Sequence, residues 1–273
     1  MIANLQTHYG FTTMPFSSAV PVPALYACAA HKEAVARLRW LISARGLGVL
    51  TGEVGAGKTV AVRAATTSLD ASRHTLIYLP NPRIGIRGIH GVIAQALGKA
   101  PCFYTADLIP QVEAALAAEA DEKDRHVLLA IDEAHLLDSN QLDAIRMLTN
   151  HGMDYASPVT ILLIGQPTLR RRLRVGDMAA LDQRIQLRYH IPAPALTPAE
   201  ADGYIRAHLA HAGRTDTLFS DDAVRAIHAH ARGMPRAINK LAITALLAAY
   251  TAGKTIADEA AARTAITEDT TTD

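Results

Sequence analysis

Residues 52–59 combine the glycines, the lysine and the hydroxyl group that a loop needs to hold a polyphosphate. They read Gly-Glu-Val-Gly-Ala-Gly-Lys-Thr and fit the pattern G-x-x-x-x-G-K-[ST]. In such a loop, backbone N–H groups and the start of the next helix face the phosphates, and glycines allow an approach that a Cβ would block. Lys58 adds a positive charge, and the Thr59 hydroxyl can ligate Mg²⁺. The expected nucleotide-binding residues are Gly52, Glu53, Val54, Gly55, Ala56, Gly57, Lys58, Thr59 and Val60.

The alternative interpretation of this segment is a flexible turn between a strand and a helix. An apolar run of strand type, 47–51, precedes the loop, and a helical pattern, 60–65, follows it. A strand, a glycine loop and a helix start in this order are the context that phosphate binding requires. The segment therefore predicts ATP and Mg²⁺ as cofactors.

Two acidic residues follow a second apolar run. Val127–Ile131 is strand-like and leads directly into Asp132 and Glu133. A carboxylate at a strand end can hold hydrated Mg²⁺ opposite Thr59, and the next one can orient and deprotonate a water for attack on the γ-phosphate. An N-cap or a surface acid pair is the alternative. We expect Thr59 and Asp132 to be metal ligands, and Glu133 and Lys58 to be catalytic.

Three further polar residues occupy places from which they could act on a triphosphate. Gln166 ends the apolar run 161–165 and is expected to sense the γ-phosphate, although a turn residue would look the same. Arg184 stands just before the last apolar run and could reach a neighbouring subunit's nucleotide as an arginine finger; a surface salt bridge is the alternative. Arg236, in Gly-Met-Pro-Arg, opens a helix and could reach back to the phosphates or serve only as a helix-cap contact.

Strand-like and helix-like segments alternate from about residue 47 to residue 190. This order predicts an α/β fold in which helices cover both faces of a five-stranded parallel sheet. The strand-like runs are 48–50, 75–79, 127–131, 159–164 and 185–189, and the helical patterns are 58–69, 86–98, 107–120, 138–150 and 168–175.

A change of pattern near residue 191 predicts a second, all-helical domain. A proline-rich connector is followed by helical patterns at 198–212, 220–231 and 235–251, where Thr197-Pro-Ala-Glu200 provides an N-cap, Pro at N1 and an acid at N3. The predicted domains are an extended N-terminal arm, 1–30, a nucleotide-binding α/β domain, 31–191, a helical lid, 192–266, and a disordered tail, 267–273.

Composition narrows the class of protein. The 273 residues are 49% hydrophobic and 19% charged, which supports a folded core. The net charge of +1 provides no global field toward nucleic acid or membrane, so any DNA binding must depend on local patches. Two cysteines form no metal-binding spacing, and neither a signal peptide nor a membrane span is apparent. We therefore expect a cytosolic protein with no membrane partner.

Taken together, these motifs resemble an AAA+ ATPase, and in detail the ExeA/GspA-like group. The resemblance covers nearly the whole chain and implies the AAA+ P-loop NTPase fold with a helical lid. The matching residues are Tyr9, Gly10, Phe11, Pro15, Phe16, Leu25, Tyr26, His31, Glu33 and Ala34, with segments 51–55, 164–167, 183–190 and 233–239.

The resemblance leaves two functions open. Stand-alone members of this group are similar in role to the MuB and TnsC ATPases, so our first hypothesis is an ATP-dependent regulator of transposition. It would form homo-oligomers, as a ring or a helical filament, on double-stranded DNA and recruit or activate a DDE transposase. The alternative is an ATPase, similar to ExeA, GspA or MshM, that assists assembly of a secretion or pilus system. A P-loop kinase for a small metabolite is a third class, disfavoured by the helical lid and Arg184.

Two basic segments could contact DNA. In ring-forming ATPases of this kind the loop after the second strand faces the central channel, which makes Arg83 and Arg87 candidates for gripping a phosphate backbone without reading bases. A solvated loop is the alternative. The run Leu169–Arg174 could contact DNA or a neighbouring subunit, or form a solvated helix.

Overall fold

The computed structural model describes residues 2–17, 19–150, 157–193 and 195–271. The chain forms two compact units. Unit 1 comprises Met1–Lys32, Gly55–Gly57 and Pro192–Asp273, and unit 2 comprises Glu33–Val54 and Lys58–Ile191. Unit 2 holds the sheet, whereas the secondary structure described in unit 1 is almost entirely helical.

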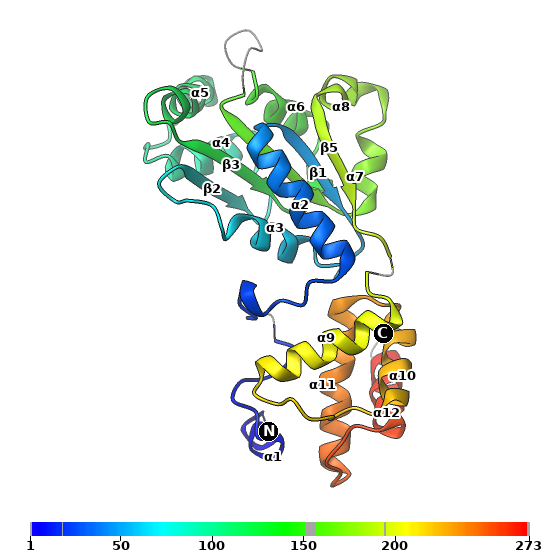
Figure 1. Ribbon diagram of the computed structural model, residues 1–273. Helices are drawn as coiled ribbons and strands as arrows, with labels where there is room; N and C mark the ends of the chain where they lie inside the picture. Colours follow the sequence, from blue (N-terminus) through cyan, green and yellow to red (C-terminus); the bar gives the residue numbers. More distant parts are fainter. Residues whose placement is uncertain (1, 18, 151–156, 194, 272–273) are drawn as a thin grey trace. The chain divides into compact units, whose positions relative to one another are not determined.

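The sheet of unit 2 has five parallel strands in the order β2-β3-β4-β1-β5 (Figure 1). The expected α/β fold with a five-stranded parallel sheet is confirmed. Because all strands run the same way, their carboxyl ends lie at one edge of the sheet and their amino ends at the other. The strands are β1 (Leu47–Thr51), β2 (His74–Leu79), β3 (His126–Ile131), β4 (Val159–Gly165) and β5 (Ile185–His190).

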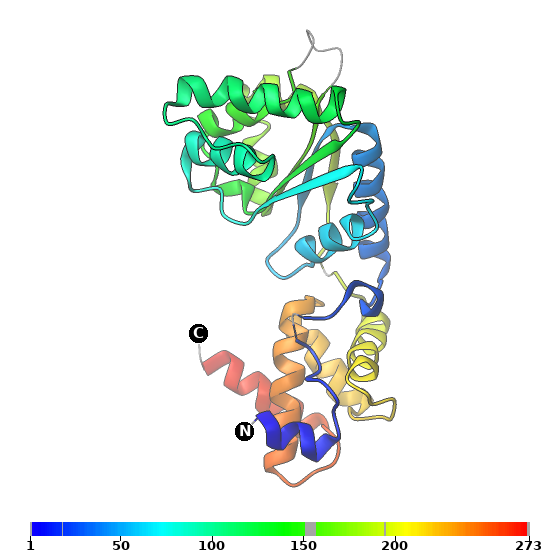
Figure 2. The same cartoon turned by 90° about the vertical axis from the view of Figure 1, so that its left-hand side faces the viewer.

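Helices cover both faces of this sheet (Figure 2). On one face, alternate strand residues such as Val49 and Leu129 join the apolar sides of α4, α5, α6, α7 and α8 in one buried cluster. On the other face lie α2 and α3. The helices associated with the sheet are α2 (Ala29–Ala44, of which 29–32 fall in unit 1), α3 (Lys58–Thr66), α4 (Gly85–Ala96), α5 (Thr105–Asp121), α6 (Ser139–Met147), α7 (Pro167–Arg172) and α8 (Ala179–Arg184), with short 3-10 turns η2 (Ala134–Leu136) and η3 (Gly176–Met178).

Close packing of α2 requires a glycine in β1. A Cβ placed on Gly48 would lie 2.3 Å from Cδ2 of Leu41, a fully buried residue of α2. A Cβ at this position would therefore require the buried Leu41 side chain to shift. The helix therefore holds β1 tightly from one side just before the phosphate loop begins.

Unit 1 is a helical bundle. A capping box between Thr197 and Glu200 starts α9, as the sequence predicts, and Ser220 caps α10. The elements are α1 (Ile2–Tyr9), η1 (Val22–Ala24), α9 (Pro198–His211), α10 (Asp221–Ala231), α11 (Pro235–Thr251) and α12 (Glu259–Thr271).

The start of the chain differs from the extended arm that its prolines suggest. Residues Ile2–Tyr9 form a helix, and Tyr9, Phe11 and Phe16 are buried in the core of the bundle. The Tyr9 hydroxyl donates a hydrogen bond to the carbonyl oxygen of Leu246 in α11, 3.0 Å away. Burial of these aromatic rings stabilises an arrangement that the local sequence does not reveal.

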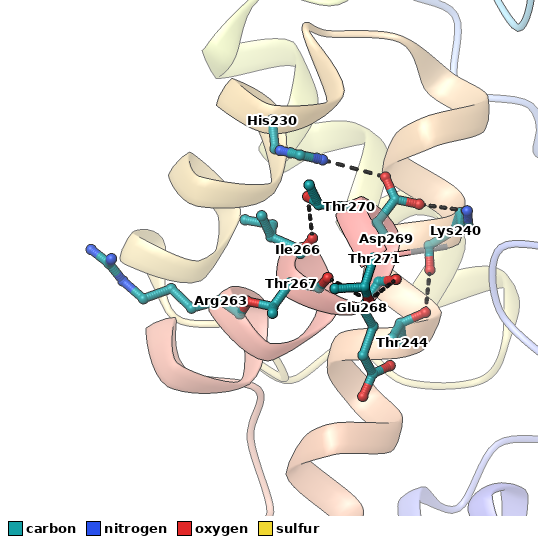
Figure 3. A network of polar contacts seen from close by, with 10 residues as sticks. All are labelled: His230, Lys240, Thr244, Arg263, Ile266, Thr267, Glu268, Asp269, Thr270 and Thr271. Atoms are coloured by element: carbon teal, nitrogen blue, oxygen red, sulfur yellow. Dashed lines mark hydrogen bonds and ion pairs between the residues drawn. The ribbon is translucent and has the colours of Figure 1, made fainter. Parts of the chain in front are cut away.

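The expected disordered tail is also wrong for residues 267–271, which continue α12. Ala261, Ala262 and Ala265 of this helix are buried against the bundle. Figure 3 shows Asp269 between Lys240 and His230: its Oδ1 lies 2.5 Å from Lys240 Nζ, and its Oδ2 lies 3.3 Å from His230 Nε2. Small apolar contacts and these polar contacts of Asp269 together hold the last turns. Among the helices of the described ranges, none combines the length and apolar character that spanning a bilayer requires.

A buried histidine makes the stability of unit 2 depend on pH. His126, at the start of β3, places Nε2 2.7 Å from the Thr160 hydroxyl. Burial, followed by the nearby charge of Arg45, lowers the His126 pKa from 6.5 to about 4. Between these values the unfolded chain binds more protons than the folded one, so stability falls as pH falls from 6.5 toward 4.

We predict that the free energy of unfolding falls more between pH 7.5 and pH 5 in the wild type than in His126→Gln. Urea denaturation at the two pH values measures this change. Each unit of difference between the His126 pKa values of the folded and the unfolded state corresponds to about 1.4 kcal/mol of stability. His8→Gln changes an exposed histidine and should retain the wild-type slope. Equal slopes for the wild type and His126→Gln would contradict the assignment.

Candidate active site

The phosphate loop connects the end of β1 to the start of α3. Gly55 and Gly57 have φ angles of 82° and 92°, a left-handed region that residues with a Cβ rarely adopt. Lys58, only 9% exposed, turns back over the loop. Its Nζ donates to the carbonyl oxygens of Gly52 and Glu53, each 2.9 Å away. The ammonium group therefore already lies at the loop, where it can exchange these carbonyls for phosphate oxygens.

Thr59 and Asp132 meet although 73 residues separate them in the chain. The Thr59 hydroxyl donates to Asp132 Oδ2 at 2.9 Å. Asp132 directly follows β3, is 6% exposed, and has its backbone N–H bonded to the carbonyl oxygen of Leu79 at the end of β2. A hydroxyl and a carboxylate joined in this way fit Mg²⁺, whose preferred ligands are oxygen atoms. These two side chains are the residues that would hold the ion beside a bound triphosphate.

Tyr78 also reaches this carboxylate, although no motif of the sequence marks it. Its hydroxyl donates to Asp132 Oδ2 at 2.7 Å. Burial raises the Tyr78 pKa above its ordinary value, and the hydrogen bond to Asp132 raises it further, so the phenol stays protonated and acts as a donor. Its place near the carboxyl end of β2 explains the contact, because β2 pairs with β3, the strand that leads into Asp132.

Glu133 follows in a left-handed conformation, with φ of 51°. This conformation costs a residue with a Cβ roughly 1–2 kcal/mol. The backbone N–H of Glu133 donates to Asp132 Oδ1 at 2.8 Å, and Ala134, fully buried, starts η2. The side chain is 49% exposed, and its Oε2 lies 3.3 Å from His135 Nδ1 without hydrogen-bond geometry. The turn thus presents a carboxylate to solvent immediately beside the buried Asp132.

Gln166 lies next to the first residue of the loop. It follows Gly165, which pairs with Thr51 in the sheet register. The N–H of Gly52 donates to the Gly165 carbonyl at 3.3 Å, which fixes the two strand ends side by side. The sensor role expected of Gln166 stays a prediction.

Arg184 lies at the opposite edge of the sheet. It is the last residue of α8, and the next residue, Ile185, pairs with Leu47, the first residue of β1. The loop follows the last residue of β1, Thr51, so the two ends are separated by the strand's length, roughly 13 Å at 3.3 Å per residue. An Arg184 nitrogen donates to the Thr149 hydroxyl at 2.9 Å. The structure therefore does not bring Arg184 to the other candidate residues of its own chain.

Arg236 belongs to unit 1, as does Gly55 of the loop. It is the second residue of α11 and is exposed. A Cβ at Gly55 would come within 2.8 Å of Arg236 Cβ, so this glycine is also needed for space.

The candidate DNA contacts differ from one another in their surroundings. Arg83 is exposed, and its N–H bonds to Asn81 Oδ1 at 3.0 Å, so its side chain projects from a turn. Arg87 is engaged: its Nε donates to the carbonyl oxygen of Phe103 at 2.9 Å, and its guanidinium lies 5.6 Å from the centre of that ring. In the basic run 169–174, Arg172 donates to the His135 carbonyl, whereas the other three arginines are exposed.

Comparison with known proteins agrees with this geometry. Residues 40–173 match the family model described as an AAA domain. The chain is 33% identical over 251 residues to the General secretion pathway protein A of Aeromonas hydrophila, an alignment that covers 90% of this chain and 45% of the relative. The chain thus spans less than half the length of that curated relative.

Solved structures share the fold. The ORC1 protein of Aeropyrum pernix, solved in complex with DNA, superposes with a TM-score of 0.69 at 15% identity, covering 91% of this chain and 68% of that one. CDC6P of Pyrobaculum aerophilum gives 0.66 at 18% identity, covering 89% and 67%. The RuvB branch migration motor of Thermotoga maritima gives 0.56 at 15%, covering 86% and 68%. The chain therefore has the AAA+ P-loop ATPase fold and carries an AAA domain, a module whose nucleotide is ATP and whose metal is Mg²⁺.

Proposed function

We propose that this protein works as an ATP-dependent assembly of several copies, in which each ATP is bound by one copy and its hydrolysis is completed by another. The observation that carries the proposal is the position of Arg184. An arginine that stabilises the transferring phosphate must lie beside it, and this arginine is at the wrong edge of its own sheet. A neighbouring copy that presents its Arg184 to the loop would complete the site.

Each remaining residue then has a defined task. Lys58 leaves the carbonyls of Gly52 and Glu53 and binds phosphate oxygens. Glu133 accepts a proton from a water molecule whose oxygen attacks the γ-phosphorus, while the bond to the β-phosphate oxygen breaks to give ADP and phosphate. Mg²⁺, when held by Thr59 and Asp132, neutralises charge on the phosphate oxygens.

Two further residues would report the state of the nucleotide. Gln166, beside the loop, would contact the γ-phosphate, and Arg236 would reach the phosphates as the sequence predicts. Loss of the γ-phosphate on hydrolysis would remove both contacts. The assembly would then loosen, which gives ATP turnover a mechanical consequence.

For the biological role we favour the assembly of a secretion or pilus system. The support is the 33% identity, over 90% of this chain, to a protein named for the general secretion pathway. The partners would then be proteins of that system together with further copies of this chain. The resemblance to transposition ATPases gains no comparable support from the relatives found.

A regulator of DNA transposition is the second candidate. Exposed arginines favour this role. Arg83 lies on the loop after β2, Arg170 and Arg171 lie on α7, and Arg174 follows α7. Such side chains can bind phosphates without reading bases, and many weak contacts add up when several copies line one duplex. In that role a transposase would be the partner.

We predict that Lys58→Ala abolishes detectable ATP binding. Charge-assisted hydrogen bonds are worth about 1.5–3 kcal/mol each, so the loss of two should weaken binding roughly 100-fold or more. Titration of a fluorescent ATP analogue measures this directly. Lys99→Ala removes an exposed lysine and serves as the control. Wild-type affinity in Lys58→Ala would exclude the loop as the nucleotide site.

We predict that Arg184→Ala hydrolyses ATP roughly 10³-fold more slowly while it still binds ATP. Glu133→Gln should also bind ATP without turnover. Mixed in equal amounts, the two inactive variants should recover activity, because a quarter of randomly formed sites (one half times one half) combine an intact Glu133 with an intact Arg184 from the neighbour.

Steady-state phosphate release from the mixture is the measurement, with Arg206→Ala as a control that changes an exposed arginine of unit 1. No recovery on mixing, with both variants folded and binding ATP, would argue against a shared site. Normal turnover by Arg184→Ala alone would show that this arginine is not the finger.

We predict that duplex DNA leaves the ATP turnover of the wild type unchanged if the protein serves a secretion or pilus system. Turnover is measured with and without duplex DNA at low salt, where phosphate contacts are strongest. Stimulation that disappears in Arg83→Ala would favour the transposition role instead.

A further inference from the structure

We propose that Tyr78 is a positioning residue of the Mg²⁺ site, whose hydroxyl fixes the carboxylate of Asp132 in the orientation that receives the ion. This inference rests on the proposed ATP hydrolysis. It assigns a role to a residue that no motif of the sequence marks.

The first support is the set of hydrogen bonds at the carboxylate. Oδ2 accepts from Tyr78 at 2.7 Å and from Thr59 at 2.9 Å, and Oδ1 accepts from the N–H of Glu133 at 2.8 Å. A carboxylate has about four acceptor positions, so one remains for a water molecule bound to the ion. The three donors come from three separate segments of the chain, and together they prevent the group from rotating.

The second support is the way in which the sheet supplies the phenol. β2 is an edge strand, and Tyr78 pairs with Ala130 of β3, two residues before Asp132. Ile77 and Leu79, on either side, are buried in the core, which anchors the strand. Since side chains alternate across a strand, Tyr78 points to the opposite face, where it is 41% exposed. Its hydroxyl can thus reach across to the end of the next strand.

The third support is chemical. The Thr59 hydroxyl can turn its oxygen lone pairs to the ion and still donate its hydrogen to Asp132, but this requires the carboxylate to keep its place. Groups that donate hydrogen bonds to the protein ligands of a metal ion orient those ligands. Loss of such a group typically weakens metal affinity 10–100-fold. Among the side chains of the described residues, the structure defines hydrogen bonds to Asp132 from two, Thr59 and Tyr78.

The test is Tyr78→Phe, which removes only the hydroxyl. Binding of a fluorescent ATP analogue is measured in Mg²⁺ titrations and again in EDTA. We expect the half-saturating Mg²⁺ concentration to rise roughly 10-fold, with affinity in EDTA unchanged. Tyr104→Phe, which alters a tyrosine that is 69% exposed, should match the wild type in both conditions. The melting temperature without nucleotide should be the same for all three proteins.

Other results would overturn the proposal in distinguishable ways. Equal loss of affinity with and without Mg²⁺ would mean a structural role only. Tighter Mg²⁺ binding by Tyr78→Phe would mean that the phenol competes with the ion, and no change would mean that Asp132 does not need it. If the wild type itself binds no nucleotide while melting as a folded protein, the proposed function fails first, and the role of Tyr78 fails with it.

Discussion

The hydrogen bond between Thr59 and Asp132 depends on one constraint, the common direction of all five strands. A parallel sheet brings the residues that follow its strands to a single edge, and β4 lies between the strands that lead to these two residues. The loop after β1 must therefore extend across a neighbouring strand to reach the end of β3. Gly48 permits tight packing of α2 on β1, and the glycines of the loop allow the turn into α3. The polar contacts at Asp132 are the consequence.

The same constraint separates Arg184 from this edge. An arginine before a strand and a loop after the adjacent strand cannot meet within one parallel sheet without a long excursion of the chain. The bond from Arg184 to Thr149 holds the side chain at the amino ends of the strands. In the proposed shared site, association between copies would therefore be part of catalysis.

Motifs and strands could be predicted because their signals are local. The residues of the glycine loop lie within a few positions of one another along the chain, and so do those of the apolar run before Asp132 and those of the capping box at Thr197. Tyr78 could not be predicted, since a tyrosine in an edge strand is also what β propensity favours and its partner lies 54 residues away. The bond of Arg87 to Phe103 likewise joins separate elements.

Helix α12 was missed for a related reason. Its Thr-rich end has weak helix propensity, and its stability depends on buried alanines and on the contacts of Asp269 with Lys240 and His230. Tertiary contacts of this kind override local preference, as they do for the aromatic residues of the N-terminal segment. The roles of Gln166 and Arg236 in the reaction stay predictions, although Gln166 lies beside the loop.

The most direct test of a shared active site is the dependence of ATP turnover per subunit on protein concentration at saturating ATP and Mg²⁺. The shared site predicts that specific activity is negligible in dilute solution and rises to a plateau as copies associate, in step with the assembled fraction seen by sedimentation. Specific activity that stays constant down to concentrations at which the protein sediments as a monomer would contradict it.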